Sequence, residues 1–181
     1  MKLRQITADF VARKRVLLRV DYNVPLKQQG KNQVVADDTR LKITLPTLEF
    51  LLKHQAKIII TSHLGRPEGK TVEKLKLDPV AKHLAKLLDK PVKKLDETVG
   101  ENVEQVVSEM KPGEIVMLEN CRFNEGEKTN DENFAKKLAS LAEVFVNDGL
   151  AVSHRAHASV VGVTKHLPSG AGLALTEEVK Q

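Results

Sequence analysis

Four short runs of apolar residues recur along the chain, and most of their side chains are β-branched or aliphatic. They span residues 16–20, 58–61, 115–118 and 144–146. Runs that are apolar at nearly every position, rather than at alternate positions, are typical of parallel strands with both faces covered. We therefore expect four buried strands.

Segments in which apolar residues have helical spacing separate these runs. The stripes cover residues 41–52, 80–88, 99–110 and 134–141, and another begins at Leu173. Strands that alternate with helices favour a parallel sheet. The sequence therefore predicts an α/β fold, a Rossmann-like three-layer αβα domain with a mainly parallel sheet.

Local signals mark the ends of these helices. Asp78 and Pro79 predict an N-cap and a first helical residue. Thr129 and Glu132 have the spacing of a capping box. Pro46 falls inside the first helical stripe, where a proline costs about 3 kcal/mol. We expect one kinked helix there rather than two elements.

Polar side chains follow each apolar run. Three of the four segments that follow the predicted strands contain an arginine. These are Arg66, Arg122 and Arg155, in a chain with only eight arginines. Ligands of open parallel sheets bind at the carboxyl ends of the strands. The planar guanidinium matches phosphate and carboxylate groups in a bidentate manner. The pattern predicts a basic, anion-binding pocket at one edge of the sheet.

Composition fits an ordinary globular chain. Of 181 residues, 41% are hydrophobic and 29% are charged. The longest apolar run has four residues, far below the about 20 that a membrane span needs, and the first residues lack the apolar core of a secretory signal. The single cysteine, Cys121, excludes an intrachain disulfide. We expect a cytoplasmic protein without a membrane partner.

The net charge of +5 favours anionic partners. The chain has six aromatic residues and no tryptophan, so surfaces on which bases could stack are scarce. Its longest basic run covers only residues 13–15. We therefore expect small phosphorylated anions, and not nucleic acid, as partners.

Two other motifs compete for a role. Residues 65–71 resemble a P-loop, but three residues separate the glycines where that motif needs four, and the next helix start lies at Asp78. His154 and His157 have the spacing of metal ligands but lack a third. We expect neither a P-loop nor a metal site, and an inert, partly buried thiol at Cys121. Three histidines lie among lysines and are expected on the solvated surface: His54, His83 and His166.

Four segments resemble the motifs of phosphoglycerate kinases. They are residues 20–25 (VDYNVP), 62–67 (SHLGRP), 118–123 (LENCRF) and 154–159 (HRAHAS), and their order and spacing match as well. The resemblance runs from about Lys2 to the end of the chain and concerns only the N-terminal half of that enzyme.

The resemblance implies a division of the chain. Residues 1–169 would form the phosphoglycerate-binding domain, and residues 170–181 would begin an interdomain linker or helix. The C-terminal nucleotide-binding domain would be absent, because the sequence stops at Gln181 inside a predicted helix.

The resemblance also implies a reaction. The family transfers a phosphoryl group reversibly from 1,3-bisphosphoglycerate to Mg-ADP in glycolysis, which gives 3-phosphoglycerate and ATP. Mg²⁺ and the nucleotide would bind to the absent domain, so this chain would hold no cofactor and would be inactive alone. In the full-length protein we expect a monomer in which this part contacts its own C-terminal domain. The alternative is a stand-alone phosphoglycerate-binding module without catalysis, and an independent P-loop protein is a third reading.

The same resemblance assigns residue roles. Arg40, at a helix start in residues 37–40, matches the catalytic arginine that helps to stabilise the transferring phosphoryl group. Asp21 and Asn23 would hydrogen-bond the glycerate portion. A basic set would hold the distal phosphate and the carboxylate: His63, Arg66, Arg122 and Arg155. The remaining substrate-binding positions would be Tyr22, Leu64 and Gly65.

One segment departs from the family pattern. Residues 149–153 are GLAVS where the family has AFGTA, so a threonine hydroxyl and a phenylalanine ring are lost. We expect Leu150 to take the apolar place of the ring and the fold to persist.

Overall fold

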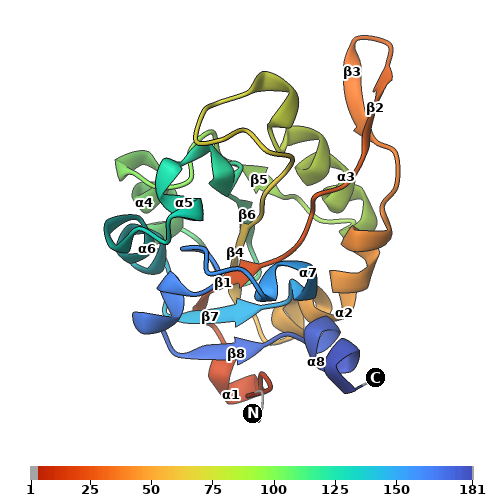
Figure 1. Cartoon of the computed structure of the whole chain (residues 1–181). Helices are drawn as coiled ribbons and strands as arrows, with labels where there is room; N and C mark the ends of the chain where they lie inside the picture. The colour runs from red at the N-terminus through yellow and green to blue at the C-terminus, as the bar shows by residue number, and fades with distance from the viewer. Residues whose placement is uncertain (1–3, 181) are drawn as a thin grey trace.

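The computed structural model describes residues 4–180, and Lys2 and Gln181, at the ends of the predicted resemblance, lie outside that range. Six strands form one sheet in the order β5-β6-β4-β1-β7-β8, and every pairing in it is parallel (Figure 1). The strands are β1 (Arg15–Arg19), β4 (Lys57–Thr61), β5 (Lys93–Lys94), β6 (Ile115–Met117), β7 (Val144–Asn147) and β8 (Ser169–Ala171). The predicted α/β fold and the four predicted strands are confirmed.

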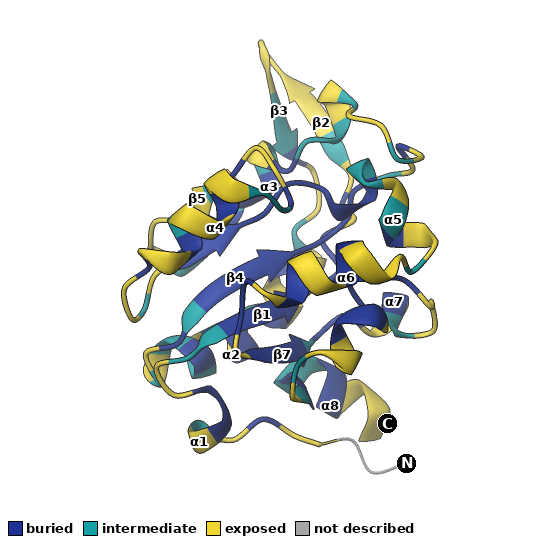
Figure 2. Ribbon diagram, turned by 90° about the vertical axis from the view of Figure 1, so that its left-hand side faces the viewer, coloured by how far each residue is buried: buried dark blue, intermediate teal, exposed yellow. Residues whose placement is uncertain are grey.

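Helices cover both faces of the sheet, which gives three layers. The helices are α1 (Ala8–Val11), α2 (Thr39–Lys53), α3 (Asp78–Leu88), α4 (Glu101–Ser108), α5 (Glu125–Lys128), α6 (Glu132–Ala139), α7 (Leu150–Ser153) and α8 (Leu173–Lys180). Residues of α1, α2 and α3 pack with Leu18 and Ile60 on one face. Residues of α4 and α6 pack with Leu17 and Ile59 on the other. Alternate apolar residues of the central strands therefore pack into opposite cores, and Figure 2 shows the buried sheet between the helices.

Three short 3₁₀ turns and one hairpin complete the described part of the chain. The turns are η1 (Glu73–Leu75), η2 (Cys121–Phe123) and η3 (Gly162–Lys165), and the hairpin consists of β2 (Leu26–Gln29) and β3 (Asn32–Val35). The antiparallel hairpin forms its own two-stranded sheet and projects away from the main one (Figure 1). Within residues 4–180, no helix is both long and apolar enough to cross a membrane.

The ends of two helices differ from the predictions. Asp78 is the first residue of α3 rather than its N-cap, which is Leu77. The Asp78 carboxylate instead pairs with Lys94 at 3.1 Å. The predicted capping box is also wrong, because Thr129 ends the preceding helix α5 and Asp131 caps α6 by accepting from the Phe134 amide.

Two further predictions concern Pro46 and the C-terminal segment. Pro46 lies within α2, which is one continuous element as predicted. The predicted boundary after residue 169 falls inside β8, which pairs with β7. Residues 170 and 171 belong to the sheet, and a Cβ on Gly170 would lie 3.1 Å from Ile6 Cγ2 and 3.2 Å from Phe10 Cε1.

Candidate functional site

A cavity of about 250 Å³ lies where the strands β1, β4 and β7 and the turn after β6 lead out of the sheet at its carboxyl edge. It contains eight of the ten residues that the sequence predicted for the site: Asp21, Asn23, Arg40, His63, Gly65, Arg66, Arg122 and Arg155. Ala151 and Val152 of α7 complete the lining and were not predicted. The strand-exit argument therefore finds most of this cavity, because parallel strands deliver their exits to one edge.

Two predicted residues lie outside the cavity lining. The Tyr22 side chain is fully buried, and its hydroxyl lies 2.7 Å from Thr44 Oγ1. Burial raises the pKa of this hydroxyl. Leu64 is also buried, and its carbonyl accepts from Asn120. Both side chains belong to the core, and the substrate-binding role of these two positions stays a prediction.

Positive charge dominates the cavity. Four arginines face one carboxylate, Asp21, which pairs with Arg40 at 2.6 Å. In the described part of the chain, the other three arginines form no salt bridge. Two acids that could neutralise them are engaged elsewhere: Glu119 binds Lys94 at 2.6 Å, and Asp148 accepts from the Leu175 amide. The excess of positive charge in the cavity therefore favours an anion with several negative charges.

His63 contributes no charge, contrary to its expected place in a basic set. The ring is 3% exposed. Burial, followed by the positive charges of Arg19, Arg122, Arg155 and Arg40, lowers the pKa of His63 to about 2. The ring is therefore neutral near pH 7 and acts through hydrogen bonds.

Gly65 joins three loops around the cavity. Its amide donates to Asn23 Oδ1 at 2.9 Å, and its carbonyl accepts from Arg122 Nη1 at 3.0 Å. Gly65 has φ +64°, and a Cβ placed there would lie 2.7 Å from Leu75 Cδ2. Glycine is favoured here by both the backbone conformation and the space.

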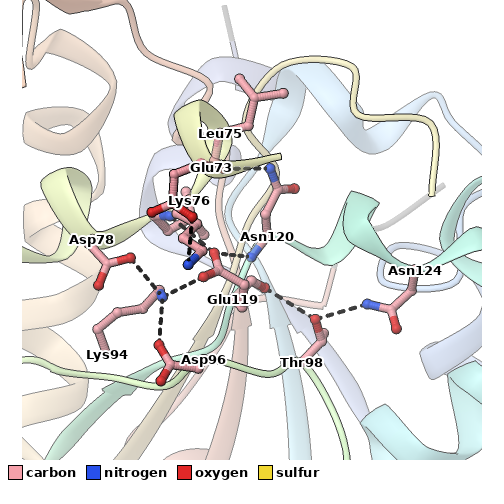
Figure 3. Close-up of polar contacts among 11 residues, drawn as sticks. Glu73, Leu75, Lys76, Asp78, Lys94, Asp96, Thr98, Glu119, Asn120 and Asn124 are labelled. Atoms are coloured by element: carbon pink, nitrogen blue, oxygen red, sulfur yellow. Dashed lines mark hydrogen bonds and ion pairs between the residues drawn. The ribbon is translucent and has the colours of Figure 1, made fainter. Parts of the chain in front are cut away.

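A buried polar network fixes the loops behind these residues (Figure 3). Glu119, after β6, accepts from Lys94 and from the Leu77 amide. Asn120 Nδ2 donates to the carbonyls of Leu64 and Leu75. The exit of β6, which carries Arg122, is thereby tied to the loop after β4, which carries His63 and Arg66.

A second buried network lies beside the cavity and was not predicted. Arg19, the last residue of β1, is fully buried. Its Nε donates to Ser159 Oγ at 2.9 Å, and Ser159 Oγ donates to Glu127 Oε1 at 2.5 Å. Arg19 Nη2 lies 3.2 Å from Nδ1 of His63. One signal in the sequence could have indicated this network. Arg19 is a charged residue inside the otherwise apolar run of residues 16–20.

The competing motifs lie at defined places in the fold, and Cys121 is more deeply buried than predicted. After Gly69 the chain enters η1, and the next helix begins at Asp78, so residues 65–71 form no P-loop. Residues 4–180 contain no group of three or more His, Cys, Asp or Glu side chains that could hold a metal. Cys121 is fully buried, and burial raises the pKa of its thiol to about 12. Such a thiol is inert.

Two surface predictions need correction. His54 and His83 are half-buried, since His54 packs on Phe50 and His83 lies 3.0 Å from Asp38, whereas His166 is exposed and pairs with Glu132. Leu150 is 40% exposed, so its side chain is not part of the core. The fold nevertheless persists, because Val152 is buried in α7 and Ser153 links Gly149 with Asn147.

Comparisons with known proteins agree on one family. A family model described as phosphoglycerate kinase matches residues 6–181. The phosphoglycerate kinases of Dictyoglomus turgidum and Coprothermobacter proteolyticus are 53% and 51% identical over 92% and 99% of this chain. The solved phosphoglycerate kinase of Pyrococcus horikoshii superimposes with a TM-score of 0.85 at 32% identity over 97% of this chain. This chain spans only 41%, 45% and 44% of these three relatives, respectively.

Proposed function

The chain belongs to the phosphoglycerate kinase family, and from this membership we propose that its arginine-lined cavity binds 3-phosphoglycerate and 1,3-bisphosphoglycerate. In a longer protein it would supply the phosphoglycerate-binding half for reversible phosphoryl transfer to ADP. The observation that carries the proposal is the convergence of four arginines on one cavity with a single carboxylate.

Charge balance supports this ligand class. The four arginines exceed Asp21 by three positive charges. 3-Phosphoglycerate carries about three negative charges, with about two on the phosphate and one on the carboxylate. Charge-assisted hydrogen bonds are stronger than neutral ones, and bidentate pairs add geometric selectivity. A small anion with an acidic group at each end matches this charge better than an anion with only one acidic group.

Each side chain has a proposed task. Arg66, Arg122 and Arg155 would hold the phosphate and the carboxylate, while neutral His63 would donate a hydrogen bond. Asn23 and Asp21 would bind the glycerate hydroxyl. Arg40 is half exposed in its side chain, at 47%, and stands at the rim, where it would stabilise charge on the transferring phosphoryl group. Phosphoryl transfer asks the protein mainly for positioning and charge stabilisation.

The nucleotide is proposed to bind elsewhere. In residues 4–180 no acidic cluster fits Mg²⁺ and no P-loop fits ATP or ADP. From the family resemblance we propose that Mg²⁺ and nucleotide bind to the C-terminal part of the longer relatives. The chain alone is expected to show no turnover, and to act in the cytoplasm as part of a monomeric enzyme.

Calorimetric titration of the 181-residue chain tests the proposal. We expect saturable binding of 3-phosphoglycerate, with weaker binding of glycerol 3-phosphate, which lacks the carboxylate, and of glycerate, which lacks the phosphate. Arg13→Lys, at an exposed arginine that contacts Gln55 away from the cavity, is the control and should bind as the parent does. Absence of saturable binding at millimolar ligand contradicts the proposal.

A stand-alone binding module is the second candidate, because the chain spans less than half of its relatives. A coupled assay with 1,3-bisphosphoglycerate and Mg-ADP distinguishes both candidates, the half-enzyme and the binding module, from an enzyme that is active by itself. Only background turnover is expected from the chain alone. Turnover in proportion to its concentration, after removal of trace host enzyme, contradicts the assignment of nucleotide binding to another domain.

A further inference from the structure

The buried network beside the cavity has a fixed direction of hydrogen bonding. An arginine side chain has donors and no acceptor. Because Arg19 Nη2 lies 3.2 Å from Nδ1 of His63, that nitrogen must accept. In a neutral imidazole the other nitrogen then carries the proton. The remaining nitrogen, Nε2, is therefore a hydrogen-bond donor.

We propose that Arg19 is a positioning residue that fixes His63 as the neutral Nε2–H tautomer, so that the ring presents a donor to an anion in the cavity. The inference rests on the proposed function only for the identity of that anion. Arg19 does not line the cavity itself and would act entirely through His63.

The position of Arg19 is determined by contacts at three of its nitrogens. Nη1 donates to the Val20 carbonyl, Nε donates to Ser159 Oγ, and Nη2 reaches His63. Ser159 in turn makes two hydrogen bonds to Glu127, from Oγ to Oε1 at 2.5 Å and from its amide to Oε2 at 3.0 Å. Glu127 is fully buried and supplies the compensating negative charge through Ser159. The contacts at Nε and Nη1 thus hold the guanidinium with Nη2 directed at His63 Nδ1.

The groups around His63 disfavour its protonation from several directions. Arg19 approaches from β1, Arg40 from α2, Arg122 from η2 and Arg155 from the segment after α7. Asp21, the one carboxylate in the cavity lining, is paired with Arg40. A doubly protonated ring would also direct an N–H at the donor of Arg19. Anion binding through His63 therefore requires no proton uptake by the ring.

Nuclear magnetic resonance of the chain without ligand tests the tautomer directly. Long-range ¹H–¹⁵N spectra of the ¹⁵N-labelled protein should show His63 Nδ1 unprotonated and Nε2 protonated. Both signals should stay unchanged between about pH 8 and pH 5, a range that spans the ordinary histidine pKa. Exposed His154 gives the solvent reference in the same spectra. A proton on Nδ1, or a mixture of tautomers, overturns the proposal without the need for any variant.

Arg19→Met then tests the role of the guanidinium. The His63 signals should become those of a tautomer mixture that titrates. Affinity for 3-phosphoglycerate should fall by the factor by which the Nε2–H tautomer is depopulated in those spectra, since only that form donates from Nε2 while neutral. If Arg19→Met does not fold, Ser159→Ala removes one of the three restraints while leaving both buried charges, and the same change in tautomer is expected. Unchanged His63 spectra in a folded variant would make Arg19 merely structural.

The two proposals fail in different ways. If the parent shows the Nε2–H tautomer but binds no 3-phosphoglycerate, the positioning role stands and the proposed ligand is wrong. If the parent binds 3-phosphoglycerate while Nδ1 carries the proton, the proposed function stands and the role of Arg19 is wrong. Arg13→Met is the matched control, because Arg13 is exposed and contacts Gln55, and it should change neither the spectra nor the affinity.

Discussion

Arg122 donates a hydrogen bond from Nη1 to the carbonyl oxygen of Gly65 at 3.0 Å. The Gly65 amide donates to Asn23 at 2.9 Å, so one glycine connects the segments that follow β1, β4 and β6. Gly65 holds φ +64°, a backbone conformation that other residues adopt at a cost of roughly 1–2 kcal/mol. The geometry of the anion cavity therefore depends on a position with no Cβ.

Gly65→Ala is expected to weaken ligand binding and to lower the free energy of unfolding by about 1 kcal/mol. The added Cβ would lie 2.7 Å from Leu75 Cδ2, and the resulting shift would move the acceptor of Arg122. Urea denaturation and calorimetric titration with 3-phosphoglycerate measure the two effects.

Gly30→Ala is the matched control for that variant. Gly30 has φ +62°, and no atom lies within 4 Å of a Cβ built there. It sits between β2 and β3, away from the cavity, so a similar loss of stability should come with unchanged binding. Equal affinity of both variants and the parent would show that Gly65 does not position the site.

The sequence predicted the parts of the fold and site that depend on local pattern. Continuous apolar runs locate β1, β4, β6 and β7, because a strand buried on both faces is apolar at most of its positions. The arginines after these strands follow from the same rule, since parallel strands end at one edge of the sheet. Arg40 lies at the start of α2, and only the family resemblance indicated it.

The parts that were missed depend on contacts distant in sequence. Arg19 and Ser159 are 140 residues apart, so the compensation of a buried guanidinium appears only in three dimensions. The edge strands β5 and β8 have two and three residues and contain no apolar run. The neutrality of His63 likewise results from burial and from arginines on four separate segments.

Arg122→Lys should reduce affinity for 3-phosphoglycerate nearly as much as Arg122→Ala does. Lysine keeps the charge but replaces the planar fork with a point charge, so it does not both reach Gly65 and hold an anion oxygen in bidentate geometry. A loss of one charge-assisted hydrogen bond corresponds to roughly 1.5–3 kcal/mol. Calorimetry on both variants measures this, with Arg13→Lys as the control. Parent-like affinity in Arg122→Lys argues against bidentate recognition.

Arg66→Gln should weaken binding while leaving the unliganded chain equally stable or more stable. Arg66 is exposed, forms no salt bridge in the described residues and lines the same cavity as three other arginines, so no favourable pairing of its charge is lost in the variant. Ligand raises the melting temperature of the parent by mass action, by an amount equivalent to about 2.7 kcal/mol at a hundredfold excess over Kd. The rise should be smaller for the variant. Melts must be compared at one salt concentration, because ions screen the repulsion.

Arg40→Gln provides the contrast to Arg66→Gln. It breaks the 2.6 Å pair with Asp21, so the unliganded chain should lose a little stability instead of gaining it. The loss is expected to be below about 1 kcal/mol, because the Arg40 side chain is half exposed. If Arg66→Gln without ligand melts several degrees below the parent, Arg66 has a structural role and its assignment to the anion site is wrong.

His63→Gln should reduce the sensitivity of the fold to acid. In the unfolded chain a histidine has a pKa of about 6.5, whereas burial and nearby arginines lower the pKa of folded His63 to about 2. Between these values the unfolded state binds a proton that the folded state does not, so stability falls as the pH drops below about 6.5. From pH 7 to pH 5 this group alone accounts for a loss of about 2 kcal/mol. Urea denaturation at both pH values should show a decrease smaller by that amount in His63→Gln, while His154→Gln, at an exposed histidine, keeps the decrease of the parent. An equal decrease in His63→Gln and the parent would mean that folded His63 takes up a proton in this range, and the cavity would then contain a charged ring rather than a neutral donor.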